Sequence, residues 1–450
     1  MAFSTLSVRG LLARGGLRSV FQPIVDLDAS AVVGHEALVR GPAGSALESP
    51  GALFAAARAE GLLSELDAAS RALAFRSAIS EGLLAELDSA CRAQAFSAAV
   101  ESGRLAPLTL FVNVEPEVLD GAPLDDLLQI AATAPRALRV VFEITERAIT
   151  ARPAELLRTV ARIREHGWAI ALDDVGADPR SLAFMSLLQP EVVKLDLRLI
   201  QERPNPEIAA IMHAVNAYTE GSGALLLAEG IETPEHVATA RALGARFGQG
   251  WLFGRPSEEL SPLRGTAVEL TRAHVEPAPN RSPFDCLAVG TPLRRAGKRL
   301  LIELSKQLEQ EALSRGDSAL IAAAFQKAHH FTIPTAERYR RLVDETAFVC
   351  VFGEGLASSP LRGIRGAALA SDDPLVGEWD VIVLTPHFAG ALLARDLGDS
   401  GPDLERTFEY ALTYRRDVVV RAASALMSRV APDTISLQAP ASLEVLADVA

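Results

Sequence analysis

Charged and amide side chains recur at the ends of short apolar segments in the first half of the chain. Carboxylates are costly there unless they are paired, hydrogen-bonded or bound to a metal. Taken singly, each has an ordinary interpretation, such as a helix N-cap, a turn residue or an ion-pair partner. The residues of this kind are Glu36, Asn113, Glu143, Asp173, Asp174, Lys194, Asp196 and Glu229.

Taken together, these residues indicate a metal site. If the apolar segments are parallel strands of a barrel, their ends meet at one face, where active sites of such barrels lie. Six carboxylates at one rim would repel one another, so cations must neutralise them. Oxygen ligands with few histidines favour Mg²⁺ or Mn²⁺. Two such ions about 4 Å apart are the usual apparatus of phosphodiester hydrolysis.

The elements that would hold these residues alternate along the first 260 or so residues. Short apolar runs are separated by segments in which apolar residues recur every three to four positions, as in 154–167 and 234–245. Strand and helix in alternation predict a parallel sheet covered on both faces. At this length the fold class is α/β, and the prediction is a TIM-like (β/α)8 barrel. The runs are 19–25, 108–114, 139–145, 169–175, 191–197, 224–230 and 248–253.

A tandem duplication lies between the first two of these runs. Residues 62–82 and 83–103 are identical at twelve of 21 positions, and both copies have a helical pattern. A period of 21 falls about 60° short of whole helical turns, so the two copies would present different faces in one straight helix. Gly82 permits a break between them. We expect a peripheral helix on the outside of the barrel, and the alternative is a helix that binds a partner.

Composition excludes several classes of protein. The chain has 450 residues, which predicts two or three domains, and its net charge of −13 argues against a nucleic-acid polymer as partner. No apolar run is long enough to span a membrane, and the start has no apolar core of a signal peptide. Cys91, Cys286 and Cys350 are too scattered for a disulfide framework. We therefore expect a cytoplasmic protein without membrane contact.

Domain boundaries follow from a change in composition. We predict a barrel over 1–265, a proline-rich linker over 266–283, a mixed α/β domain over 284–436 and a tail over 437–450. In the second domain, 293–313 and 334–346 have helical patterns, whereas 347–352 and 379–385 have strand patterns. His329, His330 and Cys350 are not surrounded by a coherent ligand set, so we interpret them as structural residues.

The first domain resembles the EAL family of cyclic di-GMP phosphodiesterases over roughly residues 15–262. Eight ordered motifs at compatible spacing make this resemblance specific, whereas one EAL tripeptide would mean nothing. The interval from Glu36 to Asn113 is longer than in the family by about one repeat unit. The motifs are FQPIV (21–25), EALVR (36–40), FVNV (111–114), FEITE (142–146), LDDVG (172–176), VKLD (193–196), AEGIE (228–232) and QGWLFGRP (249–256).

The resemblance implies hydrolysis of cyclic di-GMP to linear pGpG with two Mg²⁺ or Mn²⁺ ions. Glu229 would be the general base, and Lys194 would orient the attacking water. Gln22, Arg40 and Gln249 would contact the dinucleotide. Glu36, Asn113, Glu143 and Asp173 would hold the first ion, Asp173 would bridge, and Asp174 and Asp196 would serve the second. Glu146 and Glu232 would support these residues.

One motif departs from the family. Where the family usually has FGTGYSSL, this chain has VGADPRSL over 175–182. Proline fixes φ and Asp178 lacks the backbone freedom of glycine, so we expect the loop to take another shape. In the family this loop positions metal ligands and takes part in dimerisation. The departure favours the alternative function, a receptor that binds cyclic di-GMP without hydrolysing it. The intact Gln22, Arg40 and Glu229 argue against a scaffold that binds neither metal nor dinucleotide, and both monomer and homodimer stay open as oligomeric states.

The second domain resembles the DICT domain, a module found beside cyclic di-GMP enzymes and two-component regulators. The resemblance rests on looser motifs, which are 303–313, 324–331, 337–342, 372–396 and 403–419. It implies a sensory role with an unknown ligand or partner, and regulation of the barrel by this domain.

Overall fold

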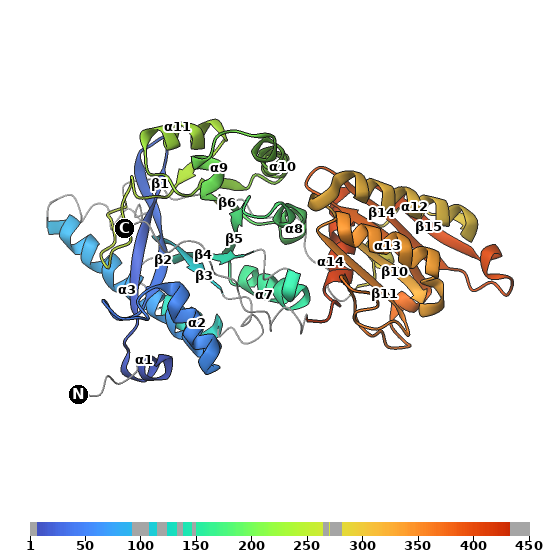
Figure 1. Ribbon diagram of the computed structural model, residues 1–450, viewed down its shortest axis with the longest axis horizontal. Helices are drawn as coiled ribbons and strands as arrows, with labels where there is room; N and C mark the ends of the chain where they lie inside the picture. Colours follow the sequence, from blue (N-terminus) through green and yellow to red (C-terminus); the bar gives the residue numbers. More distant parts are fainter. Residues whose placement is uncertain are drawn as a thin grey trace.

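Two domains lie side by side in the computed structural model, which describes residues 7–91, 108–114, 124–132, 138–145, 150–263, 270 and 281–432 (Figure 1). The first is a closed eight-stranded barrel, and the second is built on a seven-stranded sheet. The prediction of a TIM-like barrel followed by a mixed α/β domain is therefore confirmed. The barrel strands are β1 (Arg18–Asp26), β2 (Ala31–Arg40), β3 (Leu108–Asn113), β4 (Leu138–Ile144), β5 (Ala169–Val175), β6 (Val192–Leu195), β7 (Leu225–Ala228) and β8 (Phe247–Gly248).

The barrel is not parallel throughout, which corrects the expectation of an all-parallel sheet. Strand β1 runs antiparallel to both β2 and β8, while the pairs from β2 through β8 are parallel. The turn between β1 and β2 is too short for a crossover, and only antiparallel strands can be joined by so short a turn. Asp26 closes this turn, since its Oδ1 accepts the backbone N–H groups of Asp28 and Ala29.

Helices surround the barrel, and several begin with the same local signal. Ser49, Asn205 and Thr233 each accept a backbone N–H of the first turn and are followed by proline, which suits the first helical position. The helices are α1 (Val8–Arg14), α2 (Pro50–Glu60), α3 (Leu63–Cys91), α5 (Leu124–Ala131), α7 (Pro153–Glu165), α8 (Leu182–Leu188), α9 (Leu197–Gln201), α10 (Pro206–Ser222) and α11 (Pro234–Ala242).

Residues 63–91 of the duplicated segment form one continuous helix. Helix α3 crosses Gly82 and continues to Cys91, so the break that Gly82 permits is not present at this residue. Helix α3 packs against β1, β2 and β3, and the rest of the second copy lies outside the described residues. The buried positions of the first copy are Leu62, Leu66, Asp67, Arg71, Ala74, Phe75 and Ala78.

The second domain places helices on both faces of its sheet, whose strand order is β12-β11-β10-β13-β14-β15-β9. Helices α12 (Lys298–Arg315) and α13 (Ile333–Glu345) cover one face, and α14 (Arg416–Met427) covers the other. The predicted helix over 293–313 is wrong at its start, because residues 294–297 pair with β15 as an edge strand. The strands are β9 (Arg294–Gly297), β10 (Leu320–Lys327), β11 (Phe348–Glu354), β12 (Ile364–Arg365), β13 (Glu378–Leu384), β14 (Ala389–Asp396) and β15 (Thr407–Thr413).

Only part of the predicted linker can be placed. Ser282 Oγ and the Phe284 backbone N–H both donate to Glu378, so Ser282 already belongs to the second domain. Most of the linker and the whole predicted tail over 437–450 lie outside the described residues. Within the part of the chain that the structure describes, no helix is both long and apolar enough to cross a bilayer.

The two domains share an apolar interface in which α8 is central (Figure 1). All seven residues of α8 are buried, and the rings of Phe184 and Phe348 meet edge to face at 5.7 Å. Arg416 of α14 donates to Ser186 Oγ on α8 at 2.7 Å and to the carbonyl oxygen of Thr385 at 2.9 Å. Helix α8 is therefore held by residues of both domains.

Candidate functional site

The ends of the barrel strands bring the predicted acids together. Glu36 lies on β2, Asn113 ends β3 and pairs in register with Glu143 on β4, and Lys194 lies on β6. Gln22 reaches the same rim from the antiparallel strand β1 because its register partner is Glu36. Gln22 and Lys194, which are 172 positions apart in sequence, therefore face one barrel mouth, as the sequence predicted.

Lys194 is the centre of this cluster. Its Nζ lies 2.6 Å from Glu143 Oε1, 2.8 Å from Asp173 Oδ1 and 2.7 Å from Glu229 Oε1, and its side chain is 1% exposed. Burial alone would lower the pKa of Lys194, but the surrounding carboxylates outweigh burial and raise this pKa well above its usual value. Lys194 is therefore a fixed positive charge.

Glu36 is held by two amides. Asn113 Nδ2 donates to Glu36 Oε1 at 3.1 Å, and Gln249 Nε2 donates to Glu36 Oε2 at 2.5 Å. The same Gln249 nitrogen lies 3.1 Å from Gln22 Oε1. Burial would raise the pKa of Glu36, yet the charge of Lys194 and these hydrogen bonds lower it overall. Glu36 is therefore ionised, and it orients the amides of Asn113 and Gln249.

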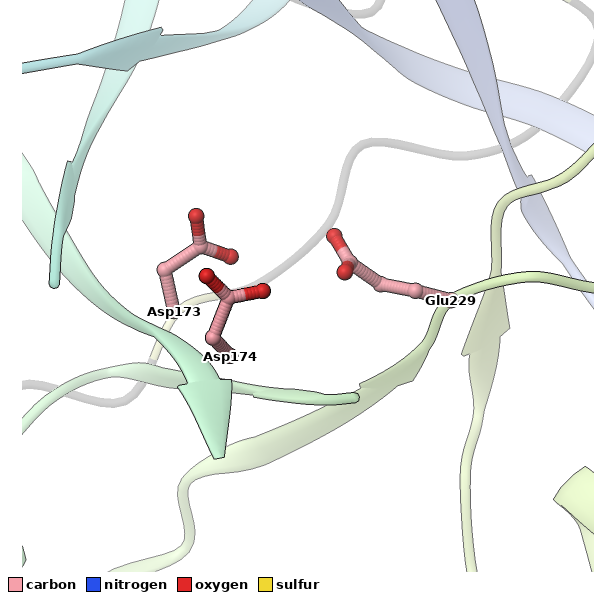
Figure 2. A group of neighbouring side chains, drawn as sticks. All are labelled: Asp173, Asp174 and Glu229. Atoms are coloured by element: carbon pink, nitrogen blue, oxygen red, sulfur yellow. The ribbon is translucent and has the colours of Figure 1, made fainter. Parts of the chain in front are cut away.

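A bulge in β5 aims Asp173 and Asp174 into the same space. Successive side chains of a regular strand point to opposite faces, but the register of β5 shifts between Leu172 and Val175. Asp174 has a left-handed φ of 54°. Both carboxylates consequently point toward Glu229, and oxygens of the three side chains lie within 4.8 Å of one another (Figure 2).

The remaining acids are not neutralised by Lys194 alone. Burial raises the pKa of Glu143 well above its usual value. Desolvation in the barrel mouth, together with the charge of Asp173, raises the pKa of Asp174 to about 6, although its side chain still reaches solvent. Burial also raises the pKa of Glu229 to about 8, with Asp173 adding to the effect and Lys194 opposing it. Such a cluster can bind further positive charge, and its oxygen ligands suit a divalent cation.

The segment after the aspartates is a tight turn that leads directly into α8. The Ala177 N–H donates to the carbonyl oxygen of Asp174 at 3.0 Å, and Asp178 Oδ1 accepts the N–H of Arg180 at 2.9 Å. Gly176 has a φ of 109°, and a Cβ there would lie 2.7 Å from Leu199. The side chain of Asp178, which departs from the family motif, therefore stabilises this turn.

Other predicted site residues are less tightly connected to the cluster. Arg40 NH1 donates to the Val39 carbonyl, and none of the described carboxylates pairs with Arg40. Asp196 caps α9, since its Oδ1 accepts the N–H of Arg198. Glu232 is exposed, and Glu146 lies outside the described residues.

Gly230 is a positioning residue that was not predicted from the sequence. Its φ is 66°, and a Cβ at this position would lie 2.5 Å from the Leu197 side chain. Only glycine fits this turn without strain, and the turn carries Glu229 into the mouth. The signal was available, because the glycine directly follows the predicted base in the AEGIE stretch.

Comparisons with known proteins agree with this geometry. The sequence model of the "EAL domain" family matches residues 68–256, and that of the "Sensory domain in DIguanylate Cyclases and Two-component system" (DICT) matches residues 289–397. Cyclic di-GMP phosphodiesterase RocR from Pseudomonas aeruginosa is 32% identical over 158 residues, which cover 34% of this chain and 40% of RocR. Probable cyclic di-GMP phosphodiesterase PdeB from Escherichia coli is 29% identical, over 33% of this chain and 29% of PdeB.

A solved structure is also similar. The manganese/cy-diGMP complex of Klebsiella pneumoniae BlrP1 has a TM-score of 0.43 and 28% identity, covering 54% of this chain and 56% of BlrP1. The chain spans less than half the length of the curated relatives it matches.

Proposed function

We propose that this chain, which carries an EAL domain followed by a DICT domain, hydrolyses cyclic di-GMP to linear pGpG under the control of the DICT domain. The names of the relatives support this substrate. The observation that carries the proposal is the convergence of Asp173, Asp174 and Glu229 around one space beside Lys194.

The candidate ligands fit Mg²⁺ or Mn²⁺, because they are carboxylate oxygens and one amide oxygen. Two such ions, when bound, would activate a water and stabilise the departing oxygen. Asp196 would contribute the carboxylate oxygen that does not cap α9. We assign Glu36, Asn113, Glu143 and Asp173 to one ion, and Asp174 and Asp196 to the second, with Asp173 shared.

Glu229 is the proposed general base. It would take the proton of the attacking water while the new P–O bond forms and the P–O3′ bond breaks. Lys194 fixes Glu229 Oε1 at 2.7 Å, so the other oxygen of this carboxylate is left for the water. Because the pKa of Glu229 is about 8, added positive charge beside it would favour the ionised form that a base requires.

Three residues are proposed to hold the dinucleotide. Gln22 and Gln249 lie side by side at the rim, where their amides can recognise a guanine or a ribose. Burial lowers the pKa of Arg40, and Glu36 opposes this effect. The guanidinium of Arg40 is not paired with any described carboxylate, so its planar fork is available for a phosphate.

Regulation by the DICT domain is supported by the position of α8. The turn over 175–181 joins Asp174 to α8, and Arg416 and Phe348 of the DICT domain hold α8. A shift of this domain would therefore act on the backbone that aims Asp173 and Asp174. A misplacement of about 1 Å at a reacting group can change the rate about 10²-fold.

The alternative is a receptor that binds cyclic di-GMP without hydrolysing it. The observation that favours this alternative is the altered turn after Asp174. Asp178 forms hydrogen bonds with Arg180 and Ser181 within this turn, and residues 179–181 pack against residues 316–318 of the second domain. In that case the dinucleotide would bind at the rim, and the signal would pass through α8 to the DICT domain.

One assay separates these functions. The full chain is incubated with cyclic di-GMP and Mg²⁺ or Mn²⁺, the products are separated, and binding is measured by calorimetry in parallel. We expect pGpG to form in wild type and in Glu220→Gln, whose side chain is exposed on α10, and to form about 10²–10⁴-fold more slowly in Glu229→Gln. Binding without any product in wild type would favour the receptor, and the absence of both would refute the proposal.

A further inference from the structure

A second cluster of charged groups lies in the DICT domain, at the start of α12. The carboxylate of Asp403, on the short 3-10 turn 403–405, accepts two bonds of 2.7 Å from Lys298 Nζ and one of 3.0 Å from Arg406 NH1. His330 Nε2 lies 3.4 Å from the same carboxylate. The carboxylate of Asp403 is therefore surrounded by the side chains of three basic residues.

The members of this cluster differ in burial. The side chains of Lys298 and Arg406 are 10% and 16% exposed, whereas that of Asp403 is 53% exposed. Among the described residues, Asp403 is the carboxylate that pairs with Lys298. A buried ammonium without a partner is strongly unfavourable, so Lys298 requires an anion at this place. In this structure the anion is the carboxylate of Asp403, which lies on the solvent side of Lys298 on a surface turn.

Arg406 is held independently of Asp403. Its NH2 group contacts Asp396 and donates to Gln326 Oε1 at 2.9 Å. His330 Nδ1 must donate to the Phe325 carbonyl at 2.9 Å, so in the neutral ring Nε2 can accept from Arg406 NH1. These contacts would keep the guanidinium in place if Asp403 moved away, and the basic setting is therefore preformed.

Two further features point to a ligand. Gln326, which holds Arg406, is buried in a left-handed conformation with φ 61°, at a register shift in β10. Strain of this kind at a non-glycine residue is most often kept at binding or catalytic sites. Next to the cluster, Lys298 Nζ lies 5.9 Å from the ring centre of Trp379. Trp379 is 8% exposed, and its indole N–H has no hydrogen-bond partner among the described residues.

We propose that Lys298, Arg406 and Trp379 form a binding site for the carboxylate group of a small organic acid, and that Asp403 occupies this site when the ligand is absent. A carboxylate is the indicated chemistry because the group now in the site is one, with both oxygens bonded to Lys298. The turn that carries Asp403 packs against α12 and belongs to the connection between β14 and β15, outside the paired residues of these strands.

The position of this site suits a sensory domain. Helix α12 has 18 residues and is therefore about 27 Å long. The site lies at its first turn, and its other end leads into the 3-10 turn 316–318, which packs against residues 179–181 of the barrel. The binding proposal does not depend on the proposed phosphodiesterase activity.

Removal of the internal carboxylate tests the proposal in the full-length protein. In Asp403→Asn, sodium acetate at pH 7.5 should raise the unfolding temperature by about 2–4 °C more than sodium chloride of equal ionic strength. Wild type should respond less, because Asp403 competes with acetate. Glu303→Gln is the matched control, since it removes an acid from the exposed Glu303–Lys306 pair on the same helix; it should respond as wild type does.

Three outcomes would overturn the proposal. One is an equal response of Asp403→Asn to acetate and chloride. Another is an acetate response that persists in Asp403→Asn combined with Lys298→Met, because the ammonium would then not be the binding group. A third is that phosphate, but not acetate, raises the unfolding temperature of Asp403→Asn, because the group bound at the site would then not be a carboxylate. If Asp403→Asn does not fold, acetate stabilisation of wild type but not of Lys298→Met gives the same decision.

Discussion

Deletion of residues 62–82, the first copy of the repeated segment, should leave a folded protein that still binds cyclic di-GMP. The reason is that the residues buried in the first copy are repeated without change in the second copy. Every position that is buried in the first copy has the identical residue 21 positions later, whereas every position that differs between the copies is exposed or only partly buried in the first. The corresponding residues of the second copy are Leu83, Leu87, Asp88, Arg92, Ala95, Phe96 and Ala99.

The connections also fit the shortened chain. After the deletion, Leu83 would follow Gly61 directly, as Leu62 does now. The segment 104–107 would then join the repeat to β3, and connections of two to six residues are ordinary in α/β folds. The buried ion pair between Asp67 and Arg71 would be replaced by the same pair of residue types, so no buried charge would be left alone.

The expected magnitude comes from Phe75, which is fully buried and packs edge to face on Trp168. Since Phe96 would take its place, the deletion should change the free energy of unfolding by less than about 1 kcal/mol. In the deletion background, Phe96→Ala should cost about 3–5 kcal/mol, because it would then empty this core position. In the full-length chain, Phe96→Ala should cost little, because Phe75 already fills the position.

Urea unfolding followed by circular dichroism measures these differences, and calorimetry measures dinucleotide binding. The reasoning is refuted if the deletion variant is insoluble, loses several kcal/mol of stability or no longer binds. It is also refuted if Phe96→Ala has the same effect with and without residues 62–82.

Four further predictions concern the barrel mouth. Glu36→Ala should abolish turnover, because it removes a carboxylate that orients two amides; a wild-type rate at saturating Mg²⁺ would show that the assigned ligand set is wrong. Glu229→Gln should lower the rate about 10²–10⁴-fold with unchanged binding, and loss of binding would instead indicate a substrate-holding role. Mn²⁺ affinity should rise as the pH rises from about 6 to about 8 and then level off, because protons on Asp174 and Glu229 compete with the metal below their pKa values; titrations at fixed ionic strength that show no such rise would contradict the assignment. Replacing residues 175–181 with FGTGYSS should raise the rate of cyclic di-GMP hydrolysis with little change in affinity for the dinucleotide. If wild type is already fast and the replacement leaves its rate unchanged, the native turn does not limit catalysis.

Local pattern was enough to predict both domains and most of their elements. The barrel strands are buried on both faces, so they are nearly continuous apolar runs, and a charged residue at the end of such a run is costly unless a partner or a metal neutralises it. For this reason the sequence alone places Glu143, Asp173 and Lys194 at one rim. Local pattern gave a wrong prediction at residues 294–297. Their sequence continues the helical pattern of 293–313, but they pair with β15 as an edge strand.

The sequence by itself determined the barrel, the second domain and the set of acids, because each depends on short-range periodicity and on the types of residue at fixed spacing. Only the tertiary structure decided how these parts act on one another. The bulge that turns Asp173 and Asp174 to the same side depends on pairing with β6, and the reversal of β1 brings Gln22 beside Glu36. Arg416 and Ser186 are 230 positions apart, and no local pattern indicates that they meet. Contacts of this kind arise from the packing of whole elements, and it is this packing that connects the acids of the barrel mouth to the second domain.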